Sequence, residues 1–355
     1  MMAFAGRHLV ESTLLCLLLS ALASCFRKGV AARYAVRLIG VSKFAIPSVL
    51  LASTGARIAV FWPATSWVSS AAHHVSAMVA AILGMLPSIG DGSTVSFRCI
   101  VAGWAFGSTA MFWGWLVRFR TSHYGLMPPT EEEQEAMNRA TSLLGMRTPI
   151  RLRTSDGLSG PALRGIFRAT VTIPRGLSER LSVSEFEAVL LHELAHARRL
   201  DNLAATFVHG LVCVFWFHPL LWSIERRLNI EREHACDEAV IACGTPPHVY
   251  ATGIVKVCRF HLFDAVSGVS AMTGSDLKRR LEHILEYESS TPLLYVPRLA
   301  IAGLTFLMTM VPIAGGYCQQ CVSNGQVSAA TRHERSQANT CPGLRDKTLI
   351  HSCFK

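Results

Sequence analysis

The chain has 355 residues, of which half are hydrophobic and 16% are charged, and its formal net charge is +10. Soluble domains usually contain about 25% charged residues, so this composition argues against a disordered or purely soluble chain. A positive charge is compatible with nucleic-acid binding, but basic cytoplasmic loops give membrane proteins the same balance. The basic residues gather beside apolar segments and no known nucleic-acid module is present, so we expect contact with the lipid bilayer and no direct nucleic-acid binding.

Four apolar segments are long enough, or nearly so, to cross a bilayer, which takes about 20 residues. They are residues 8–26, 38–56, 99–117 and 299–315. Basic residues follow the first and third segments, whereas residues 58–97 contain no Lys or Arg. Because basic loops stay in the cytoplasm, we expect three spans within residues 1–117, a cytoplasmic region at 118–298, a fourth span at 299–315 and an extracytoplasmic tail at 316–355.

A competing interpretation treats the first segment as a signal peptide that is cleaved before Cys25. The sequence Leu22-Ala23-Ser24-Cys25 resembles a lipoprotein cleavage site. Cleavage would leave Arg27 and Lys28 outside the cell and would reverse the later charge pattern. The charges therefore favour a first span that is retained.

The tail contains four of the chain's 11 cysteines, namely Cys318, Cys321, Cys341 and Cys353. An extracytoplasmic tail predicts two disulfides, whose pairing the sequence leaves open. The alternative is a zinc site that uses the Cys318-x-x-Cys321 spacing.

Residues 118–298 are expected to form a mixed α+β domain that is predominantly helical. A charged helix is predicted over 131–144, and two strands over 150–154 and 169–173. Ser182 or Ser184 can cap the following helix, which contains residues 186–200, and Ser184 with Glu187 matches the capping-box pattern.

That helix carries the sequence His192-Glu193-Leu194-Ala195-His196. Positions i and i+4 lie above one another on a helix, so both imidazoles can bind one Zn²⁺, and Glu193 can accept a proton from the attacking water. Apolar residues precede the motif, as a buried helix requires, while Arg198, Arg199 and Asp201 turn its end polar. The alternative is a helix with two structural histidines.

A catalytic zinc site needs a third protein ligand. Residues 224–241 predict a charged helix in which Glu233 and Asp237 share one face. Glu233 can bind the metal while Asp237 orients a ligating imidazole through its second nitrogen. Glu231 and His234 are alternative ligands. The interpretation without a metal is that these charged residues form a solvated face of the helix.

The segment between these two helices, residues 203–224, is apolar enough to be mistaken for another span. A complete crossing would place Glu233 on the opposite side of the membrane from His192. We therefore expect a buried or half-inserted hairpin that is broken near His218 and Pro219.

Three motifs occur in an order that resembles the BlaR/MecR-type membrane metallopeptidases, the antirepressor family of bacterial beta-lactam sensing. They are HELAHARRLDNLA, VFWFHPLLWSIERRL and EREHACDEAV, and SKFAIPSVLL, GPALRGIFRATVTIP and LKRRLEHIL agree with them. The resemblance covers about residues 8–315. It implies a gluzincin-like domain inserted between the third and fourth spans, with Zn²⁺ as cofactor, and a substrate laid along the strand 169–173 as a sheet edge. It also implies His192, His196 and Glu233 as zinc ligands, Glu193 as general base and Asp237 as the partner of a ligand.

The implied function is that of a zinc endopeptidase in the bacterial inner membrane, which cleaves a cytoplasmic transcriptional repressor or itself during signal transduction. A homodimer is compatible with this function. About 40 residues follow the expected fourth span, so we expect a member without the penicillin-binding sensor. Two alternatives are a quality-control or processing protease of membrane proteins and a non-proteolytic transducer held together by zinc. The sequence leaves the substrate, the cleavage site, the activating signal and the oligomeric state open.

Overall fold

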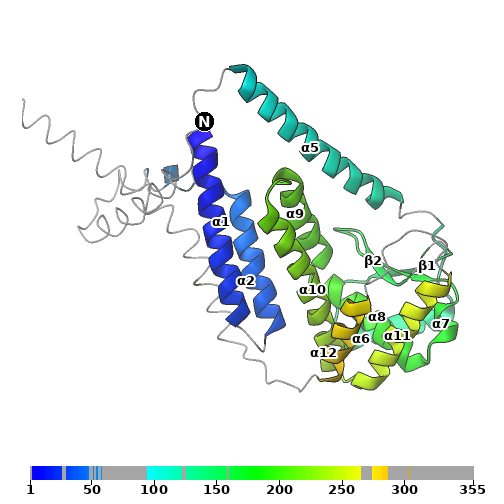
Figure 1. Cartoon of the computed structure of the whole chain (residues 1–355). Coiled ribbons are helices and arrows are strands. Elements are labelled where there is room, and N and C mark those ends of the chain that lie inside the picture. The colour runs from blue at the N-terminus through cyan, green and yellow to red at the C-terminus, as the bar shows by residue number, and fades with distance from the viewer. Residues whose placement is uncertain are drawn as a thin grey trace, which may run out of the picture. The chain divides into compact units, whose positions relative to one another are not determined.

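The computed structural model describes residues 2–25, 29–47, 94–121, 125–156, 158, 160–264 and 274–286, together with residues 51, 53, 54, 57 and 303. The chain divides into two compact units, and apart from the part of α1 before Ser12 the elements considered below belong to the unit formed by Ser12–Ala45 and Ile89–Leu304. The helices are α1 (Met2–Cys25), α2 (Val30–Ser42), the 3-10 turn η1 (Lys43–Ala45), α5 (Thr94–Thr121), α6 (Glu131–Leu143), α7 (Leu177–Arg180), α8 (Val183–Arg198), α9 (Asp201–Val214), α10 (Pro219–Ala242), α11 (Pro247–Asp264) and α12 (Gly274–Leu285). With three short strands, this is the expected α+β architecture, predominantly helical (Figure 1).

The strands form one small mixed sheet in the order β1 (Arg151–Ser155), β3 (Thr170–Pro174), β2 (Ala162–Arg164). β1 pairs with β3 in parallel, and β2 pairs with β3 in an antiparallel hairpin. Gly165 begins the hairpin loop with φ +86°, and a Cβ there would lie 2.4 Å from the Arg168 carbonyl oxygen. A glycine is therefore required at this turn.

The sheet corrects one expectation about the substrate. The strand predicted over 169–173 is β3, and it is the central strand with a partner on each side, so it cannot be a free edge. On the side of β3 opposite β1, the edge strand is β2. The sequence did not predict this strand, because its three residues show no alternation of apolar and polar side chains.

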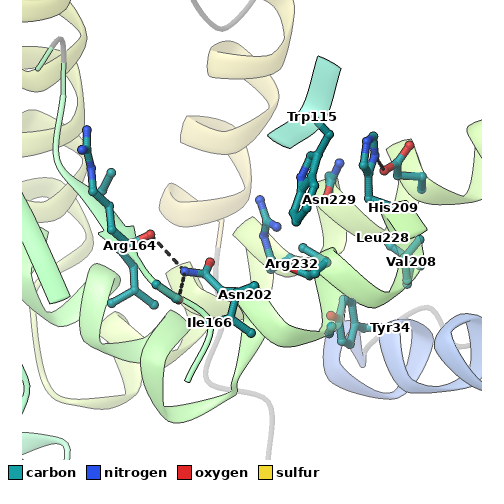
Figure 2. A pocket seen from close by; sticks show the side chains of 17 residues that line it. Tyr34, Trp115, Arg164, Ile166, Asn202, Val208, His209, Leu228, Asn229 and Arg232 are labelled. Atoms are coloured by element: carbon teal, nitrogen blue, oxygen red, sulfur yellow. Dashed lines mark hydrogen bonds and ion pairs between the residues drawn. The ribbon is translucent and has the colours of Figure 1, made fainter. Parts of the chain in front are cut away.

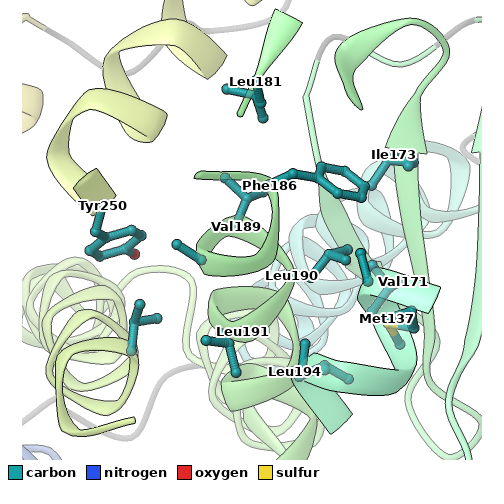
Figure 3. Packing of buried hydrophobic residues seen from close by; sticks show 14 of the residues in the cluster. Met137, Val171, Ile173, Leu181, Phe186, Val189, Leu190, Leu191, Leu194 and Tyr250 are labelled. Atoms are coloured by element: carbon teal, nitrogen blue, oxygen red, sulfur yellow. The ribbon is translucent and has the colours of Figure 1, made fainter. Parts of the chain in front are cut away.

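The core of the domain packs around α8. Apolar side chains of this helix meet α6, β3 and α11, as Figure 3 shows for Met137, Val171, Ile173, Phe186, Val189, Leu190, Leu191, Leu194 and Tyr250. Full burial of one such Leu or Ile side chain contributes about 1.5–3 kcal/mol. Packing of this extent holds α8 in one position, which any site built on the helix requires.

Capping fixes where α8 begins. The Ser182 hydroxyl accepts a hydrogen bond from the Glu185 amide, and the Glu185 carboxylate accepts one from the Ser182 amide. The capping box is thus Ser182 with Glu185, two residues before the predicted pair. Glu187 of the predicted pair instead forms an ion pair with Arg139 of α6, at 3.5 Å.

The buried Glu185 also ties α8 to α11, because Lys256 Nζ donates to both carboxylate oxygens at 2.7 and 2.8 Å. Burial alone would raise the pKa of Glu185, but hydrogen bonds from Lys256 and Ser182 lower it below its ordinary value. A carboxylate with a depressed folded-state pKa stabilises the fold above its unfolded pKa of about 4.3 and loses that contribution as the pH falls through the folded value.

We therefore expect the unfolding temperature to fall as the pH drops below about 4.3, and Glu185→Gln to remove part of this dependence. Ser182→Ala should lower the free energy of unfolding by about 1 kcal/mol at neutral pH, because the helix loses its cap. Thermal melts of the detergent-purified chain across acid pH, with the exposed Glu135→Gln as control, measure both effects. Equal acid dependence in Glu185→Gln and in the control would contradict this assignment.

The described residues include one helix that is long and apolar enough to cross a membrane, over Arg98–Val117 within α5. Two further apolar helices are shorter, His8–Ser24 and Asp201–Val214. The predicted span at 38–56 is not one continuous helix: α2 ends at Ser42, and η1 and then Pro47 follow, where proline disfavours helix in the residue before it. The predicted fourth span, apart from Gly303, and the cysteine-containing tail lie outside the described residues.

Helices α9 and α10 form a hairpin whose turn ends at His218, so the chain breaks at His218-Pro219 as the sequence predicts. The tip of this hairpin contacts α5. Trp104 Nε1 donates to the Val214 carbonyl oxygen at 2.8 Å, and a Cβ at Gly107 would lie 2.6 Å from the Trp216 ring. The apolar helix α5 therefore supports the hairpin that carries Glu233.

Candidate metal centre

Three side chains converge from two helices. His192 and His196 lie one turn apart on α8, and Glu233 faces them from α10. The two Nε2 atoms are 3.2 Å apart. The Glu233 carboxylate lies 3.4 Å from His192 Nε2 and 3.7 Å from His196 Nε2. Both histidines are buried, whereas 31% of the Glu233 side chain is exposed.

These separations fit one tetrahedral zinc ion. Ligand atoms bound at about 2.0–2.1 Å in tetrahedral geometry lie about 3.3–3.4 Å from one another. Two imidazoles and one carboxylate are also a donor set that Zn²⁺ accepts. The three side chains can therefore hold this metal with little rearrangement.

The neighbouring candidates on α10 point elsewhere. Glu231 faces α2, where Arg37 Nη1 is its nearest partner and Arg33 Nε lies 3.2 Å away. His234 stacks on His283 of α12, with ring centroids 4.4 Å apart. Burial and the nearby His283 lower the pKa of His234 to about 4, so its ring is neutral. Of the three alternatives on α10, only Glu233 reaches the histidines of α8.

The Glu231 contact yields a prediction about stability. Arg37 is 4% exposed, so Glu231→Gln leaves a buried guanidinium without a countercharge, at a cost of about 3–5 kcal/mol. We expect a large fall in the unfolding temperature but an unchanged zinc content. The double variant Arg37→Met with Glu231→Met, which removes both charges, should recover much of the loss. Loss of zinc from a folded Glu231→Gln chain would instead make Glu231 a metal ligand.

A carboxylate contacts the Nδ1 atom of His196. Its Nδ1 lies 2.9 Å from Asp201 Oδ2, the arrangement in which a carboxylate fixes the tautomer and orientation of a metal-binding imidazole. Asp201 was expected to belong to the polar end of α8, but it is 1% exposed. The chain reaches this position through Leu200, whose φ of +58° costs about 1–2 kcal/mol for an L-residue. Asp201 comes five residues after His196 in the sequence, and the strained turn brings its carboxylate back to the His196 ring.

His192 is supported from a different direction. Its Nδ1 lies 3.3 Å from Asp237 Oδ1 and 2.8 Å from the Tyr250 hydroxyl, which itself donates to Asp237 at 2.6 Å. Arg280 donates to both Asp237 oxygens. Burial and Arg280 lower the pKa of His192, but hydrogen bonds to Asp237 and Glu233 outweigh them and raise it to about 9. Burial and Asp237 raise the pKa of Tyr250, so its hydroxyl stays protonated and can donate.

Glu193 is 8% exposed and follows His192 on α8. No side chain among the described residues hydrogen-bonds to or ion-pairs with its carboxylate. The group is therefore not committed to a structural contact in this part of the protein.

A second group of possible ligands comprises His196, Asp201 and Cys236, all buried. Here Cys236 Sγ lies 3.3 Å from His196 Nδ1 and 3.5 Å from Asp201 Oδ2. Burial and the nearby Asp201 raise the pKa of the Cys236 thiol. Asp201 is already the partner of His196 Nδ1 at 2.9 Å, and this is the ring nitrogen nearest to the thiol. This donor set fits zinc less well than His192, His196 and Glu233.

Two cavities share residues of the β2 hairpin in their linings. One, of about 460 Å³, is enclosed by β2, α9 and α10 with Trp115 of α5 above it (Figure 2). The other, of about 580 Å³, is lined by residues 145–151 and 165–170 and by His196. Asn202 lines both cavities and donates to the Leu163 and Gly165 carbonyl oxygens. Of the two histidines, His196 lines the second cavity.

Sequence comparison places these features among known proteins. Residues 3–284 match the Peptidase_M56 family, described as BlaR1 peptidase M56. The chain is 29% identical over 170 residues to the regulatory protein BlaR1 of Bacillus licheniformis, which covers 46% of this chain and 28% of that protein. It is 22% identical over 210 residues to the methicillin resistance mecR1 protein of Staphylococcus aureus, which covers 56% of this chain and 35% of that protein. The chain therefore spans about a third or less of the length of these relatives, and because the family match extends over most of its residues, it belongs to the BlaR1 peptidase M56 family.

Proposed function

We propose that this protein is a membrane-embedded zinc endopeptidase with His192, His196 and Glu233 as the metal ligands. The observation that carries the proposal is the convergence of these three side chains at separations of 3.2–3.7 Å. Membership of a peptidase family supports hydrolysis as the activity.

The remaining residues of the site have distinct proposed tasks. Bound zinc would polarise the scissile carbonyl and lower the pKa of the attacking water. Glu193 accepts the proton of that water and passes it to the leaving amine. Asp201 and Asp237 hold His196 and His192 in the orientation that directs their Nε2 atoms at the metal.

The substrate we propose is a cytoplasmic protein, either a transcriptional repressor or this chain itself. The charge distribution supports a catalytic domain at 118–298 on the cytoplasmic side of the inner membrane, between a three-span region at 1–117 and a fourth span at 299–315, with the tail at 316–355 outside. Because β3 is internal, the substrate strand would lie along the β2 side of the sheet, whose hairpin residues line both cavities. The Asn202 side chain already donates a hydrogen bond to the Leu163 carbonyl oxygen. A bound peptide must therefore pair with other backbone groups or displace the Asn202 side-chain amide.

The experiment that tests the proposal is proteolysis by the full chain in detergent or liposomes. We expect self-cleavage, or cleavage of a co-expressed repressor, that stops when a chelator removes zinc and resumes when zinc is returned. Many cleaved membrane proteins instead of one regulator would favour a quality-control protease. Tightly bound zinc without any proteolysis, and signalling that survives loss of Glu193, would favour a transducer that zinc only stabilises.

A further inference from the structure

Arg280 occupies an unusual position on α12. The apolar residues Leu277, Leu281 and Ile284 recur at i, i+4 and i+7 and pack on the core of the domain. Position 280 falls on this same face, and its side chain is 11% exposed, against 78% for Lys278. A guanidinium on the buried face of an amphipathic helix is costly unless it is paired, so its partners define its role.

Those partners belong to the candidate metal centre and include the two carboxylates of α10, Tyr250 and His192. Nε and Nη2 of Arg280 donate to the two oxygens of Asp237, at 2.8 and 2.6 Å. Nη1 lies 3.6 Å from Glu233 Oε2. Nη2 also donates to the Tyr250 hydroxyl at 3.1 Å. The same Nη2 lies 3.2 Å from Nδ1 and 3.1 Å from Nε2 of His192. One guanidinium thus joins a proposed metal ligand to the carboxylate that supports another ligand.

The geometry explains why an arginine is needed at this position. Glu233 and Asp237 are four residues apart on one helix face, where like charges repel. The planar fork of a guanidinium can bind one carboxylate at two atoms and still reach a second, which fixes both rotamers. A lysine ammonium has no such fixed fork.

We propose that Arg280 is a positioning residue that holds Asp237 against His192 and Glu233 against both histidines, so that the docking of α12 controls assembly of the metal-binding site. This inference rests on the proposed function, because it takes His192, His196 and Glu233 as the zinc ligands. It assigns α12 a regulatory role, because a shift of this helix moves the guanidinium that contacts Asp237, Glu233 and His192 and so changes the affinity for metal.

The test measures metal binding by the full chain in detergent, with Zn²⁺ affinity from chelator competition and the visible spectrum of bound Co²⁺ as a report on ligand geometry. We expect Arg280→Met to weaken Zn²⁺ binding about 10–100-fold and to alter the Co²⁺ spectrum. Arg280→Lys should lie between Arg280→Met and the wild type. The matched control is Arg279→Met, an exposed neighbour that should bind as the wild type does.

A second variant separates the proposed positioning role from a simple loss of folding. Asp237→Asn with Arg280→Met removes both buried charges together and should fold, yet still bind Zn²⁺ more weakly than the wild type, because Glu233 has lost Arg280 and His192 has lost the Asp237 carboxylate. Wild-type affinity and an unchanged Co²⁺ spectrum in Arg280→Met, with only a lower unfolding temperature, would overturn the positioning role. A wild-type chain that binds no zinc would overturn the proposed function itself, and this inference with it.

Discussion

Glu233→Gln is expected to remove most of the zinc from the purified protein. Glutamine keeps the shape of the side chain but exchanges an anionic oxygen donor for a neutral amide, and only two imidazoles then hold the ion. Loss of a residue that merely supports a zinc ligand costs about 10–100-fold in affinity, so loss of a ligand should cost more than about 100-fold. Metal content by mass spectrometry after dialysis, with affinity from chelator competition, measures this effect.

The control for this variant is Glu238→Gln on the same helix. Glu238 is partly buried and lies 3.5 Å from His283, away from the three converging side chains. It should retain its zinc. Equal zinc content in both variants would show that Glu233 is not a ligand, and the metal would have to be held by other residues.

Glu193→Gln is expected to abolish detectable proteolysis while the protein keeps its zinc. The carboxylate is the one acidic group beside the histidines that makes no structural contact among the described residues, so its removal should leave the fold intact. General-base catalysis contributes about 10²–10⁴-fold to a rate, which sets the expected loss in kcat. Single-turnover cleavage of a purified substrate, or self-cleavage followed by gel and mass spectrometry, measures it.

Zinc content and unfolding temperature serve as the internal controls for Glu193→Gln. Both should match the wild type, because Glu193 binds neither the metal nor a structural partner in this account. Proteolysis at the wild-type rate would exclude Glu193 as the base. Loss of zinc together with activity would point to a structural role instead.

The proposed ligands could be selected from the sequence because their spacing follows helix geometry. His192 and His196 are one turn apart in one helix, and Glu233 and Asp237 are one turn apart in another. What the sequence could not decide was which acid on α10 faces α8. That choice depends on α2, whose Arg33 and Arg37 bind Glu231 and turn it away from the histidines.

The residues that support the ligands were harder to find. Asp201 reaches His196 only because α8 ends in a strained turn at Leu200, which no helical periodicity predicts. Tyr250 and Arg280 come from helices far along the chain, and their approach to His192 is a property of the tertiary fold. A signal for Arg280 was present, namely a charged residue on the apolar face of a short amphipathic helix.

Strand patterning gave two of the three strands within about one residue but missed β2, and with it the correct edge of the sheet. Order within a sheet is set by long-range pairing, so two predicted strands could not reveal that a third strand covers β3. The predicted second span differs for a local reason, since Pro47 interrupts a segment that hydropathy alone treats as continuous.

The most direct test of the central claim is X-ray absorption at the zinc edge of the wild-type protein, purified without added metal. We expect one zinc per chain, with nitrogen and oxygen neighbours at about 2.0–2.1 Å, scattering typical of two imidazoles, and no sulfur neighbour. A sulfur neighbour at about 2.3 Å would place the metal at Cys236 instead. That result, or a chain that binds no zinc, would contradict a site formed by His192, His196 and Glu233.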